Sequence, residues 1–317
     1  QLVSRPPTKL SVPATLASPS TATVVKASEK LNPPPETYPP ELNVPARKAG
    51  QFYLKYLYHA GKAYVDFYKG GIGNLRATAR LAKSLREKAE AHPDRQSIFT
   101  RAEWQIVKRS RADKLRLPVF GLILLVLGEW TPLIAIYITP VIPEACRIPA
   151  QVKRTLRKAE EKRNSRRRWV VMNMEKLFAR DREVSETQMN EQMRTWTDTS
   201  KPLTGTGSGL QLQEIIPRSV PVDHVAKLHL YPLFLLSSKL DAYSRIWDLV
   251  NIMPPKAVLQ WGLRRRLEYL NKDDSMITRD GGHHALSAKE VARACAERGL
   301  GSHVLDRSEA DMRRDLA

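Results

Sequence analysis

The chain has 317 residues and contains 52 Lys and Arg against 33 Asp and Glu, which gives a formal net charge of +19. This excess favours an anionic partner, either nucleic acid or a membrane surface with acidic lipids. Only two cysteines are present, so a disulfide framework and a cysteine-based metal cluster are excluded.

Residues 1–48 resemble a targeting segment followed by a tether. Residues 1–28 contain no Asp or Glu and nine Ser or Thr, a bias typical of mitochondrial transit peptides. Ten prolines precede residue 46, and proline breaks the amphipathic helix that such peptides form. We expect residues 1–48 to be disordered or extended and to direct the chain to the mitochondrion.

Residues 49–98 are predicted to be a helical segment that lies in the intermembrane space or at a membrane interface. Its first half mixes Tyr with Lys, which suits a membrane interface. An amphipathic helix that packs on its own neighbours fits the pattern equally well. Gly70, Gly71 and Gly73 are expected to divide the segment into two helices.

Residues 99–143 are predicted to be a pre-membrane helix and a transmembrane span. Thr100 and Glu103 form the capping box that begins the helix. Residues 117–142 contain one ionisable side chain, that of Glu129. The 22 residues from 117 to 138 would form a helix about 33 Å long, enough to cross a bilayer. Six basic residues lie on each side, in residues 101–116 and 143–162, so the charge bias does not decide the orientation.

Glu129 is the candidate ion-coupling residue of this span. An ionised side chain in mid-membrane costs about 2.5–3.5 kcal/mol on insertion scales, so the carboxyl favours its protonated form until a cation compensates. Such a group can alternate between a proton and a cation, as an exchanger requires. A structural hydrogen bond is the alternative role. Gly128, Pro132 and Pro118 are the predicted kink positions.

Residues 144–317 are predicted to form a helical domain with clustered basic side chains. Residues 153–168 hold nine basic residues and two acidic ones. Phosphate contacts from Lys and Arg would bind RNA, and acidic inner-membrane lipids such as cardiolipin offer the same chemistry. The candidate RNA- or lipid-binding residues, which become ribosome- or lipid-binding residues under the family resemblance given below, are Lys153, Arg154, Arg157, Lys158, Arg166, Arg167, Arg168, Arg264, Arg265 and Arg266.

Residues 283–317 read as a helix, an extended loop and a second helix. Ser287 with Glu290 forms a capping box, and Gly299 follows Arg298 as a helix stop. Val291, Ala294 and Cys295 are expected to face the second helix. This layout is similar to the SAP-type DNA-binding motif, so a nucleic-acid-binding protein is one reading.

Two segments together resemble one family. They are TRAEWQIVKRSRADKLRLPVFGLILLVLGEWTPL with PVIPEACRIPAQ, and LRRRLEYLNKDDSMITRDGGHHALSAKEVARACAERGL. Both look like the leucine-zipper/EF-hand transmembrane (Letm) family of the mitochondrial inner membrane, in its fungal branch with a ribosome-binding domain. The resemblance covers roughly residues 97–317. No heptad repeat and no EF-hand loop is present, so calcium sensing does not carry over.

The resemblance implies an all-α protein with one transmembrane helix and a 14-3-3-like matrix domain. It implies that the chain binds the mitochondrial ribosome and supports membrane-protein biogenesis and cation homeostasis. The alternative is a subunit of a potassium/proton or calcium/proton exchanger, which would require a homo-oligomer or partner subunits. No nucleophile–base pairing, phosphate-binding loop, H-E-x-x-H or C-x-x-C motif is present. We therefore expect no enzyme activity, cofactor or metal.

Overall fold

A computed structural model describes residues 21–91, 99–127, 142–180, 221–300 and 307–316. All regular elements of these residues are helices, which confirms the predicted all-α class. The α-helices are α1 (Thr21–Leu31), α2 (Tyr53–Glu90), α3 (Arg101–Leu127), α5 (Pro149–Met172), α6 (Met174–Arg180), α8 (Leu230–Lys239), α9 (Ile246–Val250), α10 (Lys256–Asp280), α11 (Ala288–Arg298) and α12 (Glu309–Leu316). Short 3-10 helices are η1 (Pro35–Thr37), η4 (Glu144–Cys146), η5 (Val222–Lys227) and η6 (His283–Ala285).

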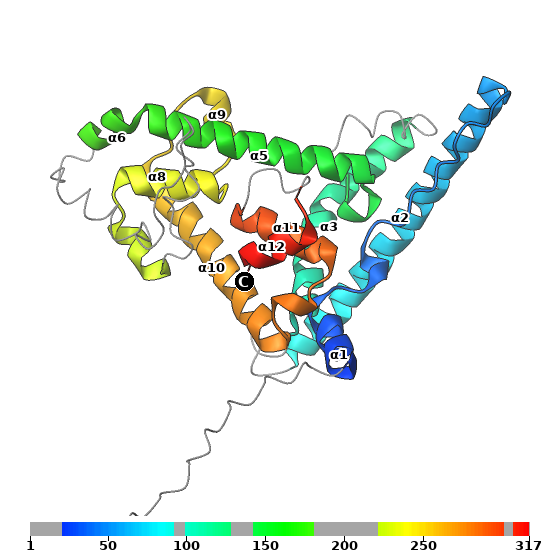
Figure 1. Ribbon diagram of the computed structural model, residues 1–317, viewed down its shortest axis with the longest axis horizontal. Coiled ribbons are helices and arrows are strands. Elements are labelled where there is room, and N and C mark those ends of the chain that lie inside the picture. Colours follow the sequence, from blue (N-terminus) through cyan, green and yellow to red (C-terminus); the bar gives the residue numbers. More distant parts are fainter. Residues whose placement is uncertain (1–20, 92–98, 128–141, 181–220, 301–306, 317) are drawn as a thin grey trace, which may run out of the picture.

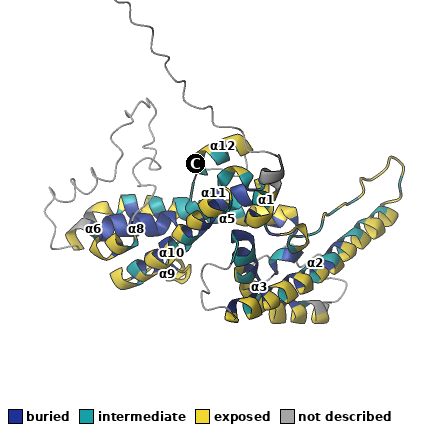
Figure 2. Cartoon of the chain, turned by 90° about the horizontal axis from the view of Figure 1, so that it is seen from below, coloured by how far each residue is buried: buried dark blue, intermediate teal, exposed yellow. Residues whose placement is uncertain are grey.

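The largest core surrounds α8. Every residue of this helix is buried, and Figure 2 shows it as the dark centre of its half of the molecule. α5, α6, α10 and η5 pack around it, with Leu233, Leu259 and Leu263 fully enclosed. The surrounding helices explain why α8 is apolar on all its faces rather than on one stripe. Pro232 lies in its first turn, where a backbone N–H would have no hydrogen-bond partner within the helix.

A second core joins α1 to the C-terminal helices. Leu31 of α1 packs with Ile277 of α10, Val291 of α11 and Met312 of α12, and its side chain is fully buried. The prediction that residues 1–48 are disordered or extended is therefore wrong for α1. The prolines on both sides of this stretch hid the helix in the sequence.

α2 and α3 form an extended pair at the other side of the molecule (Figure 1). Phe67 and Tyr68 of α2 pack near Phe120 of α3. The predicted break at the three glycines is wrong, because α2 is one helix. At Gly71 a Cβ atom would lie 2.8 Å from the carbonyl oxygen of Ala145. Glycine at this position lets η4 pack closely against α2 and does not form a turn.

The predicted C-terminal helix–loop–helix is confirmed at its described ends. The Ser287 side chain accepts from the backbone N–H of Glu290 and caps α11. Gly299 ends α11 in the left-handed conformation, with φ of 63°. α11 and α12 pack together through Val291, Cys295 and Met312, and they lie between α10 and α3 (Figure 1).

The predicted transmembrane span falls only partly within the described residues. Among the residues that the structure describes, we find no helix with both the length and the apolar character needed to cross a bilayer. Residues 128–141 lie outside the described residues, so the span is not tested over that stretch. Pro118 lies inside α3, which continues to Leu127.

Candidate functional site

The basic side chains of α5 divide into exposed and internally paired groups. α5 is a long helix that runs from the neighbourhood of α3 to that of α8 and α9 (Figure 1). Five of the candidate residues on it have exposed side chains, namely Lys153, Arg154, Arg157, Lys158 and Arg168. Four of them lie in the first half of the helix, close to the point where the chain returns from the apolar segment. Their exposure allows these side chains to contact an anionic surface.

Arg166 belongs to the fold rather than to this exposed group. Its side chain is 4% exposed and forms ion pairs with Asp241 at 2.6 Å and Asp248 at 2.5 Å. Its guanidinium also stacks 3.8 Å from the centroid of the Tyr243 ring. This corrects the prediction that Arg166 binds an external partner. The prediction failed because a basic run does not reveal which position points inward.

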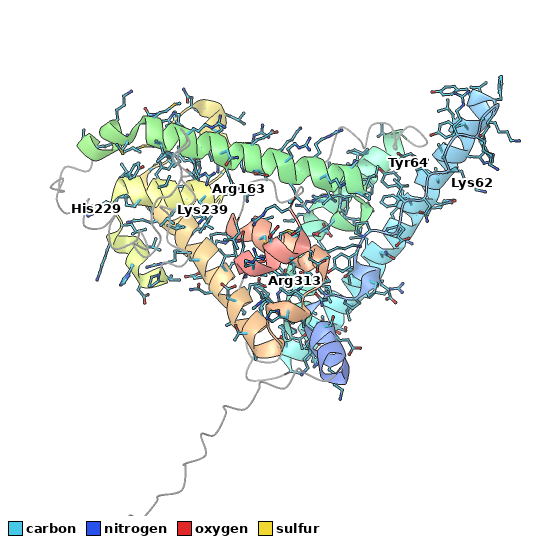
Figure 3. The ribbon with its side chains drawn as sticks, viewed as in Figure 1. Lys62, Tyr64, Arg163, His229, Lys239 and Arg313 are labelled. Carbon is cyan, nitrogen blue, oxygen red and sulfur yellow. The ribbon has the colours of Figure 1, made fainter. Side chains whose placement is uncertain are left out.

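Arg163 and Arg167 are neither fully exposed nor fully buried. Arg163 points from α5 toward α11 (Figure 3) and donates to the carbonyl oxygen of Ala296 at 2.6 Å. Arg167 donates to the Asn164 side chain at 2.6 Å. Burial lowers the pKa of Arg163 and of Arg167 from the ordinary value of an arginine. Both side chains are half-buried, and Arg167 keeps only part of its surface for an external contact.

The second predicted basic patch lies on α10. Arg264 and Arg265 are exposed, and the Arg265 guanidinium lies 5.5 Å from the centroid of the Trp261 ring, which is itself 66% exposed. Arginine with an exposed aromatic ring suits RNA, because the ring can stack on a base while arginine contacts phosphate. Arg266 instead donates to the carbonyl oxygen of Glu297 at 2.7 Å, so it positions α11 against α10.

We name the exposed candidate residues the basic surface, which consists of one patch on α5 and another on α10. It consists of Lys153, Arg154, Arg157, Lys158 and Arg168 on α5 and Arg264 and Arg265 on α10.

A groove of about 610 Å³ lies beside this surface, between the second half of α5 and the segment around α9. Trp169, Phe234 and Met253 contribute apolar walls, and Lys158 and Arg245 contribute charge. The α9 segment also exposes Ile246 to 65%, Leu249 to 73% and Ile252 to 55%. Large apolar side chains grouped on a surface mark a site of interaction with another molecule. This groove is not apparent from the sequence, because its walls come from segments far apart in the chain.

A buried polar network is the third feature, and sequence reasoning missed it as well. Arg101, at the start of α3, is 1% exposed. It pairs with Asp273 of α10 at 2.9 Å and Glu290 of α11 at 3.1 Å. Arg109 adds a second pair to Glu290 at 2.7 Å. Burial raises the pKa of the Glu290 carboxyl, but the neighbouring guanidinium groups outweigh burial and hold it below its usual range.

Glu129, Gly128 and Pro132 lie outside the described residues, so the structure does not place the predicted ion-coupling carboxylate. Ion exchange at this residue stays a prediction.

Comparisons with known proteins identify the family. The family model described as "LETM1-like, RBD" matches residues 99–317. A search of curated proteins and a search of solved structures found no match. The fungal branch stays a prediction. Because the family model spans more than half of the chain, from the start of α3 to the C-terminal helices, the protein belongs to the LETM1-like family with a ribosome-binding domain.

Proposed function

We propose that this protein binds the mitochondrial ribosome at the inner membrane and thereby supports membrane-protein biogenesis and cation homeostasis. The observation that supports this most directly is the basic surface on α5 and α10. Its side chains are exposed, and all of them lie inside the region that matches the LETM1-like ribosome-binding model. The net charge of +19 adds long-range attraction for ribosomal RNA.

The basic surface and the groove would contribute to binding in different ways. Contacts between Lys or Arg and RNA phosphates give affinity that falls steeply with salt. The apolar walls of the groove, including Trp169 and the α9 segment, suit an apolar side chain of a ribosomal protein, and that contribution resists salt. Ribosome binding is therefore expected to weaken with salt down to a residual affinity that the groove provides.

We propose further that the ribosome-binding domain faces the matrix and that the apolar residues 117–142 attach the chain to the inner membrane. The composition of this segment and the family resemblance support the attachment. Lys153 and Arg157 lie near the membrane end of α5, where acidic lipids would also attract them. The ribosome and the lipid surface are thus two ligands of similar chemistry, and the experiment must separate them.

The test is co-sedimentation of the full chain with purified mitochondrial ribosomes. Two charge-reversal variants are compared: Arg157→Glu with Lys158→Glu, and Arg264→Glu with Arg265→Glu. Each lost phosphate contact should lower the slope of log affinity against log salt by nearly one. The matched control is Arg80→Glu, which changes an exposed arginine on a different helix, α2.

A parallel measurement uses vesicles that contain cardiolipin. If the α5 variant loses vesicle binding and keeps ribosome binding, the first half of α5 is a lipid contact. If both double variants bind ribosomes like the control at every salt concentration, the proposed role of the basic surface is wrong.

Cation/proton exchange is a separate hypothesis that rests on Glu129 and the family resemblance. The test is Glu129→Gln in reconstituted vesicles, because glutamine keeps the size and hydrogen bonding of the side chain and removes its charge. Exchange should fall to background while ribosome binding is retained. Exchange at the native rate in this variant would exclude Glu129 as the coupling residue.

A further inference from the structure

One wall of the groove beside α5 is held in place by a single buried arginine. This wall is the α9 segment, residues 241–252, which lies alongside the second half of α5 (Figure 1). From α5, the Arg166 guanidinium donates to the carboxylates of Asp241 and Asp248. It also donates to the carbonyl oxygens of Tyr243 and Ser244 at 3.2 and 3.3 Å. The α9 segment is therefore fixed against α5 before any partner binds.

The backbone restrains the same segment at both of its ends. Asp241 and Asn251 have φ angles of 52° and 55°, and no other non-glycine residue that the structure describes has a positive φ. Asp and Asn adopt this left-handed conformation more readily than most other residues. Asn251 is the left-handed cap that ends α9. A wall that is preformed in this way binds a partner at a small cost in conformational entropy.

The restrained segment presents apolar side chains to solvent. Ile246, Leu249, Val250 and Ile252 are between 55% and 73% exposed, and Leu249 and Ile252 line the groove. These side chains cannot turn into the core unless the bonds of Arg166 break. They therefore remain available for the apolar surface of another molecule.

The charges of the groove favour an acidic partner. Ion pairs to the two aspartates of the α9 segment already balance the charges of Lys162 and Arg166. Among the residues that the structure describes, Lys158 and Arg245 have no carboxylate partner, and Glu161 has no cationic partner. Two unpaired cations thus line the groove with one unpaired carboxylate, and an acidic side chain that enters it is attracted.

We infer that the groove binds an amphipathic helix that carries acidic residues beside its apolar stripe. The α5 wall extends from Lys158 to Trp169, about 17 Å, which matches three turns of a helix. Both walls contain helices, so an extended peptide would find no strand edge for its backbone groups, whereas a helix satisfies its own. This inference deepens the proposed ribosome binding and rests on it only in assigning the helix to a ribosomal protein.

A lipid chain and an RNA strand fit the lining less well. Ser165, Asn251 and the ion pairs of Arg166 make part of the groove polar. A bare hydrocarbon chain would remove these groups from water without bonding to them. The carboxylate of Glu161 would repel RNA phosphates, and the aliphatic side chains of the α9 segment offer no ring on which a base could stack.

The test measures the binding of fluorescent, stapled helical peptides of about 18 residues, or five turns, to the full chain in phosphatidylcholine nanodiscs. The first peptide has a leucine stripe flanked by glutamate, and the second replaces glutamate with lysine. The third has the composition of the first in scrambled order. The acidic helix should bind about fivefold more tightly than the lysine helix, because two exposed charge pairs distinguish them. Equal binding of the acidic and scrambled peptides would overturn the inference.

Two double variants connect this binding to the groove. Leu249→Asp with Ile252→Asp should weaken binding of the acidic helix by more than about tenfold, because two apolar contacts are lost. The matched control is Leu54→Asp on α2, which changes a leucine that is 63% exposed and should have no effect. Lys158→Glu with Arg245→Glu should reverse the preference, so that the lysine helix binds more tightly. If this variant still prefers the acidic helix, the assignment of these cations is wrong.

Two further measurements distinguish the possible partners. If Leu249→Asp with Ile252→Asp lowers binding to phosphatidylcholine–cardiolipin vesicles and leaves helix binding unchanged, the α9 segment contacts lipid and the inference is wrong. The acidic helix should also displace the native chain from mitochondrial ribosomes at high salt, where the groove provides the residual affinity. A helix that binds the groove without displacing ribosomes would support the helix site and contradict the ribosomal assignment alone.

Discussion

Arg101→Met tests whether the buried network joins the first part of the chain to the ribosome-binding domain. The native guanidinium is 1% exposed and contacts three elements. It bonds to Asp273 of α10 at 2.9 Å, to Glu290 of α11 at 3.1 Å, and to the carbonyl oxygen of Leu31 in α1 at 3.0 Å. Methionine keeps much of the apolar stem of the side chain. It removes these bonds and the longer one to the second Asp273 oxygen at 3.5 Å, so the loss of stability reports on the guanidinium group.

The expected loss of stability depends on the cationic partners that Asp273 and Glu290 keep in the variant. Asp273 keeps Arg298 at 2.8 Å, and Glu290 keeps Arg109 at 2.7 Å. Because each carboxylate still has one cationic partner, we expect the lower end of the range for a broken buried pair, about 3 kcal/mol. This corresponds to roughly a 150-fold change in the unfolding equilibrium. With a urea m-value of about 3 kcal/mol/M, the midpoint should fall by about 1 M.

The assay is urea unfolding in mild detergent, followed by tryptophan fluorescence. The matched control is Lys83→Met, which removes an exposed pair to Glu87 at 3.8 Å on α2 and should cost less than about 0.5 kcal/mol. A midpoint for Arg101→Met equal to that of the control would refute the view that these segments form one cooperative unit.

Three further outcomes are expected. Burial raises the pKa of Glu144, but the Arg293 guanidinium outweighs burial and holds this pKa at about 2, below the ordinary 4.5. The native protein should therefore exceed Glu144→Gln in free energy of unfolding by a constant amount above pH 4.5, and this difference should shrink as the pH falls toward 2. Burial raises the pKa of Cys146 to about 12, so mass spectrometry should find it unmodified by iodoacetamide at pH 8 until denaturant is added. Arg166→Gln should lower the free energy of unfolding by about 2 kcal/mol with little loss of the salt-dependent ribosome affinity. Arg168→Gln should lower this affinity and leave the free energy of unfolding nearly unchanged. Equal free energies of unfolding for the two variants would contradict the structural role of Arg166.

Local signals predicted the helices well because each depends on residues close together in the chain. Thr100 and Glu103 form the expected reciprocal cap, with bonds of 2.9 and 3.3 Å. At the start of α11, Ser287 caps as expected, but the Glu290 side chain turns away to Arg101 and Arg109. The capping pattern was therefore only half right: the Glu290 carboxylate forms buried ion pairs, which are stronger than a bond to one backbone N–H, and the Ser287 N–H donates to the Asn32 side chain at 2.7 Å instead.

The sequence shows which residues are basic but not which of them face solvent. The exposed Arg264 and the buried Arg166 both stand in runs of three arginines. Only Asp241 and Asp248, more than 70 residues further along the chain, show that Arg166 turns inward. Both carboxylates lie in segments that were read as ordinary helix. The groove beside α9 was missed for the same reason, since no single segment contains enough of its walls.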